Sequence, residues 1–174
     1  QKHLGENEEA YLAKLENQMS DMEISDYQVT NLKERGKPVM ESFSFSLNDA
    51  VEQIGDKLYL NPLFFAAVTE NPFKLDQRDY PVDFTYPQEH KFVFTLNLPE
   101  GYQVENIPEN IALSLPNEYG NFKYQINQTG NALQILTNFN IHASVVPALE
   151  YPNLKAFFAQ MVQKETEKVV LSKI

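Results

Sequence analysis

The spacing of hydrophobic residues predicts a helix near each end of the chain. Near the N-terminus, Leu12, Leu15 and Met19 recur at helical spacing, which indicates an amphipathic helix over residues 6–21. Near the C-terminus, Pro152 is well placed to begin a second helix, because proline is favoured at the first helical position. The apolar residues that follow it form one continuous stripe on a helix: Leu154, Phe157, Phe158, Met161 and Val162.

Between the two helices, hydrophobic and polar residues alternate with a period of two, the pattern of a half-buried strand. The alternation is clearest in residues 42–47 and 92–98. Pro81 and Pro87 enclose a shorter run, which we expect at a sheet edge because proline cannot donate a hydrogen bond to a neighbouring strand. The remaining strands are expected at residues 24–29, 57–60, 111–115, 122–126, 133–141 and 169–174.

These runs give about eight or nine strands at a spacing of roughly 8–12 residues, which is typical of a β-sandwich. We therefore predict a mostly β fold, an antiparallel β-sandwich with an N-terminal and a C-terminal amphipathic helix. The chain shows no internal repeat and no low-complexity linker. We expect residues 1–22 to form a connecting helix and residues 23–174 to form the β-sandwich domain.

The charge balance narrows the range of partners. The 174-residue chain contains 24 acidic and 14 basic residues, which gives a formal net charge of −10. A surface of this charge repels phosphate groups, so nucleic acid and anionic lipid are poor candidate partners. The chain has no apolar run of roughly 18 residues, the length at which a membrane-spanning helix is considered. We therefore expect no nucleic-acid partner and no membrane span.

The sequence contains few candidate catalytic residues. It contains no cysteine, which excludes thiol catalysis, disulfide bonds and metal sites that need cysteine ligands. A serine or threonine nucleophile would need His3, His90 or His142 as its base, and none of these lies in an HExxH or Gly-x-Ser-x-Gly motif. We therefore expect no catalytic residue, no cofactor and no enzymatic activity in this chain.

Three acidic residues, Asp76, Asp79 and Asp83, lie close together in the sequence and could gather oxygen ligands around calcium. The segment lacks the alternating acids and the turn glycine of an EF-hand loop. We therefore expect no metal here, and we expect these carboxylates to bond to Arg78 or to backbone N–H groups.

Two other functions stay open at this point. The 24 acids include many carboxylate pairs of the kind that glycosidases use, but nothing in the sequence selects one pair. Exposed tyrosines could form a platform for stacking against sugars, and Tyr11, Tyr102 and Tyr119 are candidates. The simpler interpretation, which we favour, is that they are ordinary aromatic residues of the core or its rim.

A more specific signal lies in the middle of the chain. Its motifs are NPFK at residues 71–74, RDYPVDFTYP at 78–87, LPEGYQVE at 98–105 and IP at 107–108. With these motifs, the chain resembles a C-terminal domain of unknown function that follows the transglutaminase-like domain in secreted bacterial proteins. Later segments agree, including GNF at 120–122 and VVLSK at 169–173. The resemblance covers about residues 58–174.

This resemblance implies an immunoglobulin-like β-sandwich that is the accessory domain of a larger protein, in the periplasm or outside the cell. The parent protein would carry a transglutaminase-like Cys-His-Asp core upstream, and none of that core's catalytic residues falls in this chain. The implied function is to pack on or position that core, so the expected partner is the upstream part of the same polypeptide. The alternative is a β-sandwich module that binds a glycan or a peptide.

The RDY motif is the candidate contact with the neighbouring domain. Arg78 can pair with Asp79 or Asp83 and so hold the start of the edge strand in place. Relative domain arrangements depend on such surface contacts. Arg78, Asp79, Tyr80 and Asp83 are therefore the residues that we expect at an interface.

Overall fold

The computed structural model describes residues 7–18, 22–34, 36–47 and 50–174. The contacts within the chain divide it into two compact units, residues 1–50 and 51–174. The division that the sequence suggests after residue 22 stays a prediction. No helix in the described part of the chain is long and apolar enough to cross a membrane.

The N-terminal unit consists of one helix and one antiparallel strand pair: α1 (Glu8–Gln18), β1 (Met22–Thr30) and β2 (Met40–Leu47). The register of the pair shifts between Ser25 and Gln28, where Asp26 has a φ of 53°. Such a bulge places an extra residue in one strand and increases its twist. The helix and both strands predicted for this part are confirmed, although residues 6 and 19–21 of the predicted helix lie outside the described residues.

Aromatic rings hold this unit together. Tyr27 of β1 lies 6.2 Å from the Tyr11 ring of α1 and 6.3 Å from the Phe43 ring of β2. Phe43 in turn lies 6.2 Å from Phe45, two residues along the same strand. The helix therefore packs on the face of the β1–β2 pair that carries Tyr27 and Phe43, which is the face that the alternation of Ser and Phe in β2 predicts to be covered.

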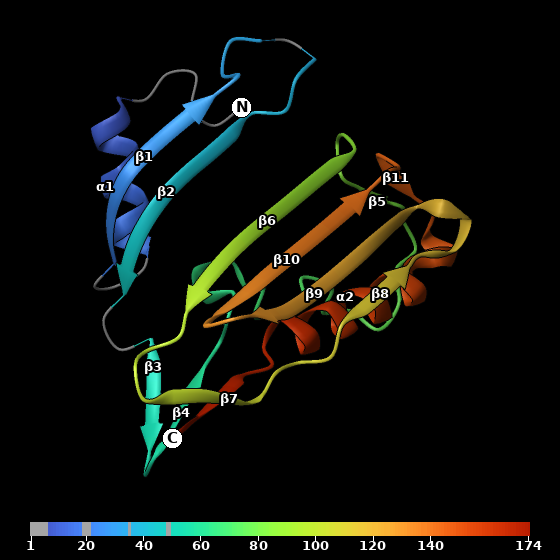
Figure 1. Cartoon of the computed structure of the whole chain (residues 1–174). Helices are drawn as coiled ribbons and strands as arrows, with labels where there is room; N and C mark the ends of the chain where they lie inside the picture. The colour runs from blue at the N-terminus through green and yellow to red at the C-terminus, as the bar shows by residue number, and fades with distance from the viewer. Residues whose placement is uncertain (1–6, 19–21, 35, 48–49) are drawn as a thin grey trace. The chain divides into compact units, whose positions relative to one another are not determined.

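The second unit contains two antiparallel four-stranded sheets (Figure 1). The strands of the first sheet are, in spatial order, β6 (Gln88–Asn97), β10 (Ala132–Ile141), β9 (Gly120–Thr129) and β8 (Ile111–Ser114). Those of the second are β3 (Val51–Ile54), β4 (Lys57–Leu60), β12 (Val169–Lys173) and β7 (Tyr102–Asn106). A separate pair joins β5 (Val82–Asp83) to β11 (Val145–Val146). Three short 3-10 helices complete the unit: η1 (Phe64–Ala66), η2 (Pro116–Glu118) and η3 (Ala148–Glu150).

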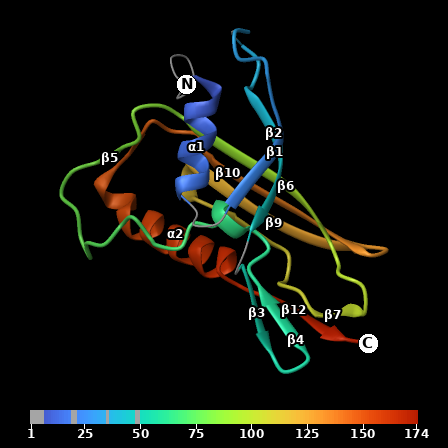
Figure 2. The same ribbon diagram turned by 90° about the vertical axis from the view of Figure 1, so that its left-hand side faces the viewer.

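Helix α2 (Tyr151–Glu165) covers one face of the β6-β10-β9-β8 sheet (Figures 1 and 2). Its Phe158 ring lies 5.5 Å from Phe139 of β10 in an edge-to-face arrangement, and its Leu154 is fully buried. Full burial of one such side chain stabilises a fold by about 1.5–3 kcal/mol. One connected core joins α2 to both sheets, because residues of β4 and β12 belong to the same buried cluster as those of β9 and β10.

The predicted mostly β, antiparallel fold with two helices is confirmed. The described residues also contain three strands that the sequence pattern does not predict: β3, β7 and β11. These strands are two to five residues long, and β3 is exposed at every position. A strand without a buried face carries no alternation of polar and apolar residues, which is why the pattern does not reveal it. Helix α2 begins at Tyr151, one residue earlier than predicted.

Candidate functional site

The predicted interface residues lie in the 74–87 segment, which follows η1, contains β5 and leads into β6. One end of this segment is bound to α2. The Tyr151 hydroxyl donates to the Leu75 carbonyl oxygen at 2.8 Å, and Lys155 Nζ donates to the same oxygen at 2.9 Å. Lys155 Nζ also forms an ion pair with Asp76 Oδ1 at 2.9 Å, which lowers the pKa of Asp76. The start of the segment is therefore held on the first turns of the helix.

The other end of the segment is bound to β11. Val82 pairs with Val146, and the Phe84 N–H donates to the Ser144 carbonyl oxygen at 2.7 Å. Asp83 Oδ1 accepts a hydrogen bond from the Thr85 N–H at 2.7 Å, which supports the left-handed Thr85 (φ 68°). The segment is thus a loop whose two ends are both anchored to the rest of the unit.

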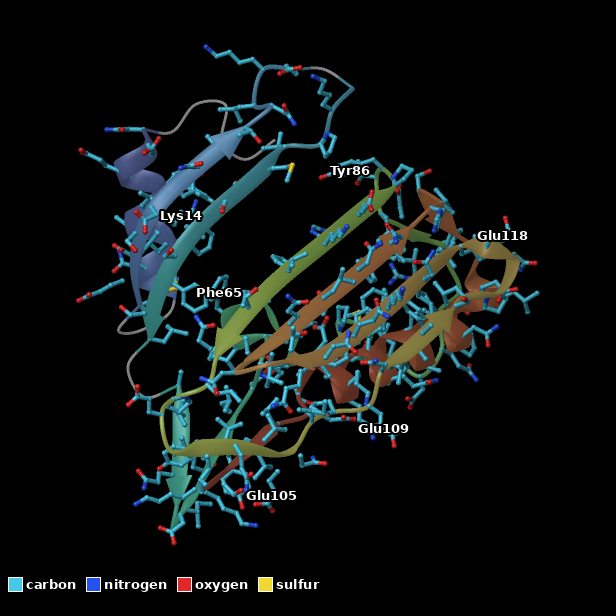
Figure 3. The ribbon with its side chains drawn as sticks, in the orientation of Figure 1. Lys14, Phe65, Tyr86, Glu105, Glu109 and Glu118 are labelled. Carbon is cyan, nitrogen blue, oxygen red and sulfur yellow. The ribbon has the colours of Figure 1, made fainter. Side chains whose placement is uncertain are left out.

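Large apolar side chains of this loop nevertheless face solvent. Tyr80 is 78% exposed, Tyr86 is 64% exposed and Leu75 is 63% exposed. Figure 3 shows Tyr86 beside the beginning of β6. Arg78 and Asp79 are exposed as well, and in the described part of the chain Arg78 has no ion-pair partner. The expected pairing of Arg78 with Asp79 or Asp83 is therefore absent from the described contacts, and only the backbone bond of Asp83 matches the expectation.

A second polar site lies at the ends of β8, β9 and β10; two of its residues, Gly120 and Asn121, belong to the GNF segment, but nothing in the sequence marks that segment as part of a site. A hollow of about 350 Å³ is lined by Ser114, Leu115, Glu118, Gly120, Asn121 and His142. Figure 3 shows Glu118 at the turn between β8 and β9. Asn140 Nδ2 donates to Asn121 Oδ1 at 2.9 Å, and Asn121 Nδ2 lies 3.0 Å from His142 Nε2. Three side chains, from β9, β10 and the residue that follows β10, thus form one hydrogen-bonded relay beside the hollow.

The turn at this hollow has a constrained backbone. Asn117 and Glu118 have φ values of 53° and 55°, in the left-handed region that most residues avoid. A Cβ atom at Gly120 would lie 2.4 Å from the Asn140 carbonyl oxygen, so that only glycine fits there without a shift of the backbone. Such constraints often occur at binding sites, where the surrounding structure maintains them.

The histidines do not form a catalytic pair with a hydroxyl group in the described part of the chain. The His142 ring bonds to Asn121, and the His90 ring stacks on Phe139 with centroids 6.1 Å apart. His3 lies outside the described residues. Within the described ranges, no group of three or more His, Asp or Glu side chains is placed to hold a metal ion.

A buried acidic residue at the end of α2 is the third unusual feature. Glu165 is 5% exposed, and its Oε2 accepts a hydrogen bond from the Val68 N–H at 2.6 Å. Burial raises the pKa of Glu165 to about 7. The nearby Tyr124 hydroxyl is buried without a hydrogen-bond partner in the described structure, and burial raises its pKa. The helical spacing of Phe158, Met161 and Glu165 is the signal that could have placed this carboxyl group on the buried face.

Comparison with known proteins gives one family and one weak structural similarity. Residues 56–171 match the model of a family described as a domain of unknown function with a solved structure, DUF3858. No curated protein matches the chain. A crystal structure described as a "putative protease" from Parabacteroides distasonis ATCC 8503 is similar to 56% of this chain, with 13% identity and a TM-score of 0.49. The similar region is 19% of that protein's chain, so this chain spans less than two thirds of it.

Proposed function

The chain belongs to the DUF3858 family, whose description states no function, and we propose that it is a non-catalytic accessory domain of a larger extracytoplasmic protein. In this proposal it follows a transglutaminase-like domain in the same polypeptide and packs on that domain through the 74–87 segment. The fold in the proposal is an immunoglobulin-like β-sandwich. Two antiparallel four-stranded sheets that contribute to one core support this part of it.

The observation that carries the proposal is the exposure of Tyr80, Leu75 and Tyr86 on a loop with two anchored ends. Tyrosine and arginine dominate the binding energy of many protein interfaces, and Arg78 lies two residues from Tyr80. A loop with two anchored ends loses less conformational entropy in a complex than a loop that is free to move at both ends. Exposed tyrosine and leucine side chains on such a loop are therefore suited to contact a folded neighbour.

The test is binding between the full 174-residue chain and the separately purified domain that its gene encodes immediately upstream, measured by isothermal titration calorimetry. We expect the double variant Arg78→Ala/Tyr80→Ala to bind at least ~10-fold more weakly than the unchanged chain. The matched control is Ile54→Ala/Ile174→Ala, which removes two side chains that are 57% and 83% exposed elsewhere on the unit. The control should keep the original affinity.

Two outcomes would overturn the proposal. Equal affinity of the Arg78→Ala/Tyr80→Ala variant and the unchanged chain, with equal melting temperatures, would exclude the 74–87 segment as the interface. An upstream gene segment that encodes no transglutaminase-like domain would remove the proposed context.

A further inference from the structure

The hollow beside Asn121 is built from parts that are distant in sequence and held rigidly. Ser114 ends β8, Glu118 belongs to η2, and His142 directly follows β10. The Leu115 N–H donates to the Gly120 carbonyl oxygen at 2.8 Å, and the His142 N–H donates to the Tyr119 carbonyl oxygen at 2.9 Å. Asn117 Nδ2 also donates to Glu150 Oε1 at 3.2 Å, which ties the turn to η3. Main-chain and side-chain hydrogen bonds therefore hold the residues that line the hollow in place.

The hydrogen-bonded relay determines which groups the hollow offers. Asn121 uses Oδ1 to accept from Asn140, so its Nδ2 is the atom that donates to His142 Nε2. An Nε2 that accepts a hydrogen bond leaves the ring proton of a neutral imidazole on Nδ1. His142 then supplies an N–H donor, Glu118 supplies two acceptor oxygens, and the Ser114 hydroxyl can do either. Donors and acceptors thus occur together around one hollow.

The lining residues exclude several classes of ligand. No basic residue lines the hollow and Glu118 does, which disfavours phosphate or carboxylate ligands. Leu115 is the one aliphatic side chain in the lining, so that an apolar ligand would gain little burial there. One carboxylate with neutral neighbours is also a poor set of ligands for a divalent cation. An uncharged ligand rich in hydroxyl groups fits, because each hydroxyl both donates and accepts.

The sheet face also favours a sugar over a peptide strand. Strand β9 pairs with β8 and β10, and β10 pairs with β6 and β9, so both strands have neighbours on both sides, while the free sheet edge at this end is the side of β8 that faces away from β9. A peptide that extends a sheet needs unpaired backbone N–H and C=O groups. The face around Asn121 and Asn140 offers side chains for recognition, because the backbone groups of β9 and β10 are used within the sheet.

We propose that the hollow lined by Ser114, Glu118, Asn121 and His142 binds a carbohydrate through hydrogen bonds to its hydroxyl groups. This site is separate from the 74–87 segment and does not depend on the accessory function. Glu118 would bind two neighbouring hydroxyl groups with its two carboxylate oxygens, and His142 Nδ1–H would donate to a third sugar oxygen. Asn121 acts through His142, whose orientation it holds.

The test is an NMR titration of the ¹⁵N-labelled full chain with maltose, cellobiose and N,N′-diacetylchitobiose, each to ~20 mM, a range that detects affinities as weak as millimolar. We expect at least one sugar to give saturable shifts at the backbone amides of Ser114, Asn121 and His142. Glu118→Gln and Asn121→Ala should each weaken that binding at least ~5-fold. Gln134→Ala, which removes an exposed amide elsewhere on β10, is the control and should leave the affinity for that sugar unchanged.

Each other outcome overturns the proposal. No saturable shift with any of the three sugars would exclude carbohydrate binding in this range. Equal binding by Glu118→Gln, Asn121→Ala and the unchanged chain would place the sugar elsewhere. A blocked tripeptide, acetyl-Ala-Thr-Ala-amide, that shifts the same amides more strongly than the sugars would assign the hollow to peptides. Melting curves show that each variant is folded before its binding is interpreted.

Discussion

Glu165 accepts a hydrogen bond from the Val68 N–H at 2.6 Å, although 97 residues separate the two in the sequence. The same residue's carbonyl oxygen accepts from Asn61 Nδ2 at 2.8 Å. Glu165 thereby binds both ends of the 61–68 segment to the C-terminal end of α2. Its carboxyl group is buried in the process, close enough to Tyr124 to help raise the pKa of that hydroxyl.

The burial of Glu165 makes the stability of the fold depend on pH. The pKa of Glu165 is raised from 4.5 to about 7, so the folded chain binds more protons than the unfolded chain between these two values. The free energy of unfolding should therefore fall as pH rises through this window, by up to about 3 kcal/mol from this group. Urea unfolding at a series of pH values between ~4.5 and ~8 measures this change in the free energy of unfolding.

Glu165→Gln is the matched variant, because a glutamine oxygen can still accept from the Val68 N–H but does not titrate. As pH rises, the free energy of unfolding of the Glu165→Gln variant should increase relative to that of the unchanged chain. Ionisation of the other acidic residues is common to both chains and cancels in this difference. A difference that does not change with pH would show that the pKa of Glu165 is the same in the folded and the unfolded chain.

The buried Tyr124 hydroxyl should lower the free energy of unfolding of the chain. It is buried and lacks a hydrogen-bond partner in the described structure, and an unsatisfied buried polar group costs about 1–3 kcal/mol. We expect Tyr124→Phe to raise the free energy of unfolding by about 1 kcal/mol. The control is Tyr151→Phe, which removes a hydroxyl that donates to the Leu75 carbonyl oxygen and should lower that free energy by a similar amount. Losses of equal size in both variants would contradict the prediction.

Gly120 should tolerate no side chain. A Cβ at this position would lie 2.4 Å from the Asn140 carbonyl oxygen, a backbone atom that cannot move without disturbing the β9–β10 pairing. We expect Gly120→Ala to lower the free energy of unfolding by about 2–4 kcal/mol, measured by urea unfolding. Gly130→Asn is the comparison, because no atom lies within 4 Å of a Cβ there and asparagine tolerates its φ of 59°. It should cost less than about 1 kcal/mol, and an equal loss in both variants would argue against the close contact.

The protonation of the His142 ring tests the relay directly. Because Asn121 Nδ2 donates to Nε2, the neutral ring should carry its proton on Nδ1. Long-range ¹H–¹⁵N correlation spectra distinguish the two ring nitrogens and should show this form for His142. Asn121→Ala should give a mixture of both forms. Predominance of the Nε2–H form in the unchanged chain would mean that the amide groups of Asn121 and Asn140 point the other way.

The sequence alone determined the class of the fold and most of its elements. The alternation at Phe43 and Phe45 predicts a strand because side chains of a strand point alternately to its two faces. The stripe from Leu154 to Val162 predicts α2 for the corresponding reason in a helix. Both patterns are local, and each reports directly which side of an element is buried. Strand β3 could not be predicted in this way because it has no buried side.

The tertiary structure decided which side chains meet. Sequence proximity suggests that Arg78 pairs with a neighbouring aspartate, whereas one ion pair of this segment joins Asp76 to Lys155, 79 residues away on α2. The hollow at His142 needs a turn, two strands and a glycine that lie between Ser114 and His142, and no motif connects them. The proposed contact of Arg78, Asp79, Tyr80 and Asp83 with an upstream domain stays a prediction for the same reason. Local spacing records burial within one element, but binding sites arise where distant elements come together, and that depends on how the whole chain packs.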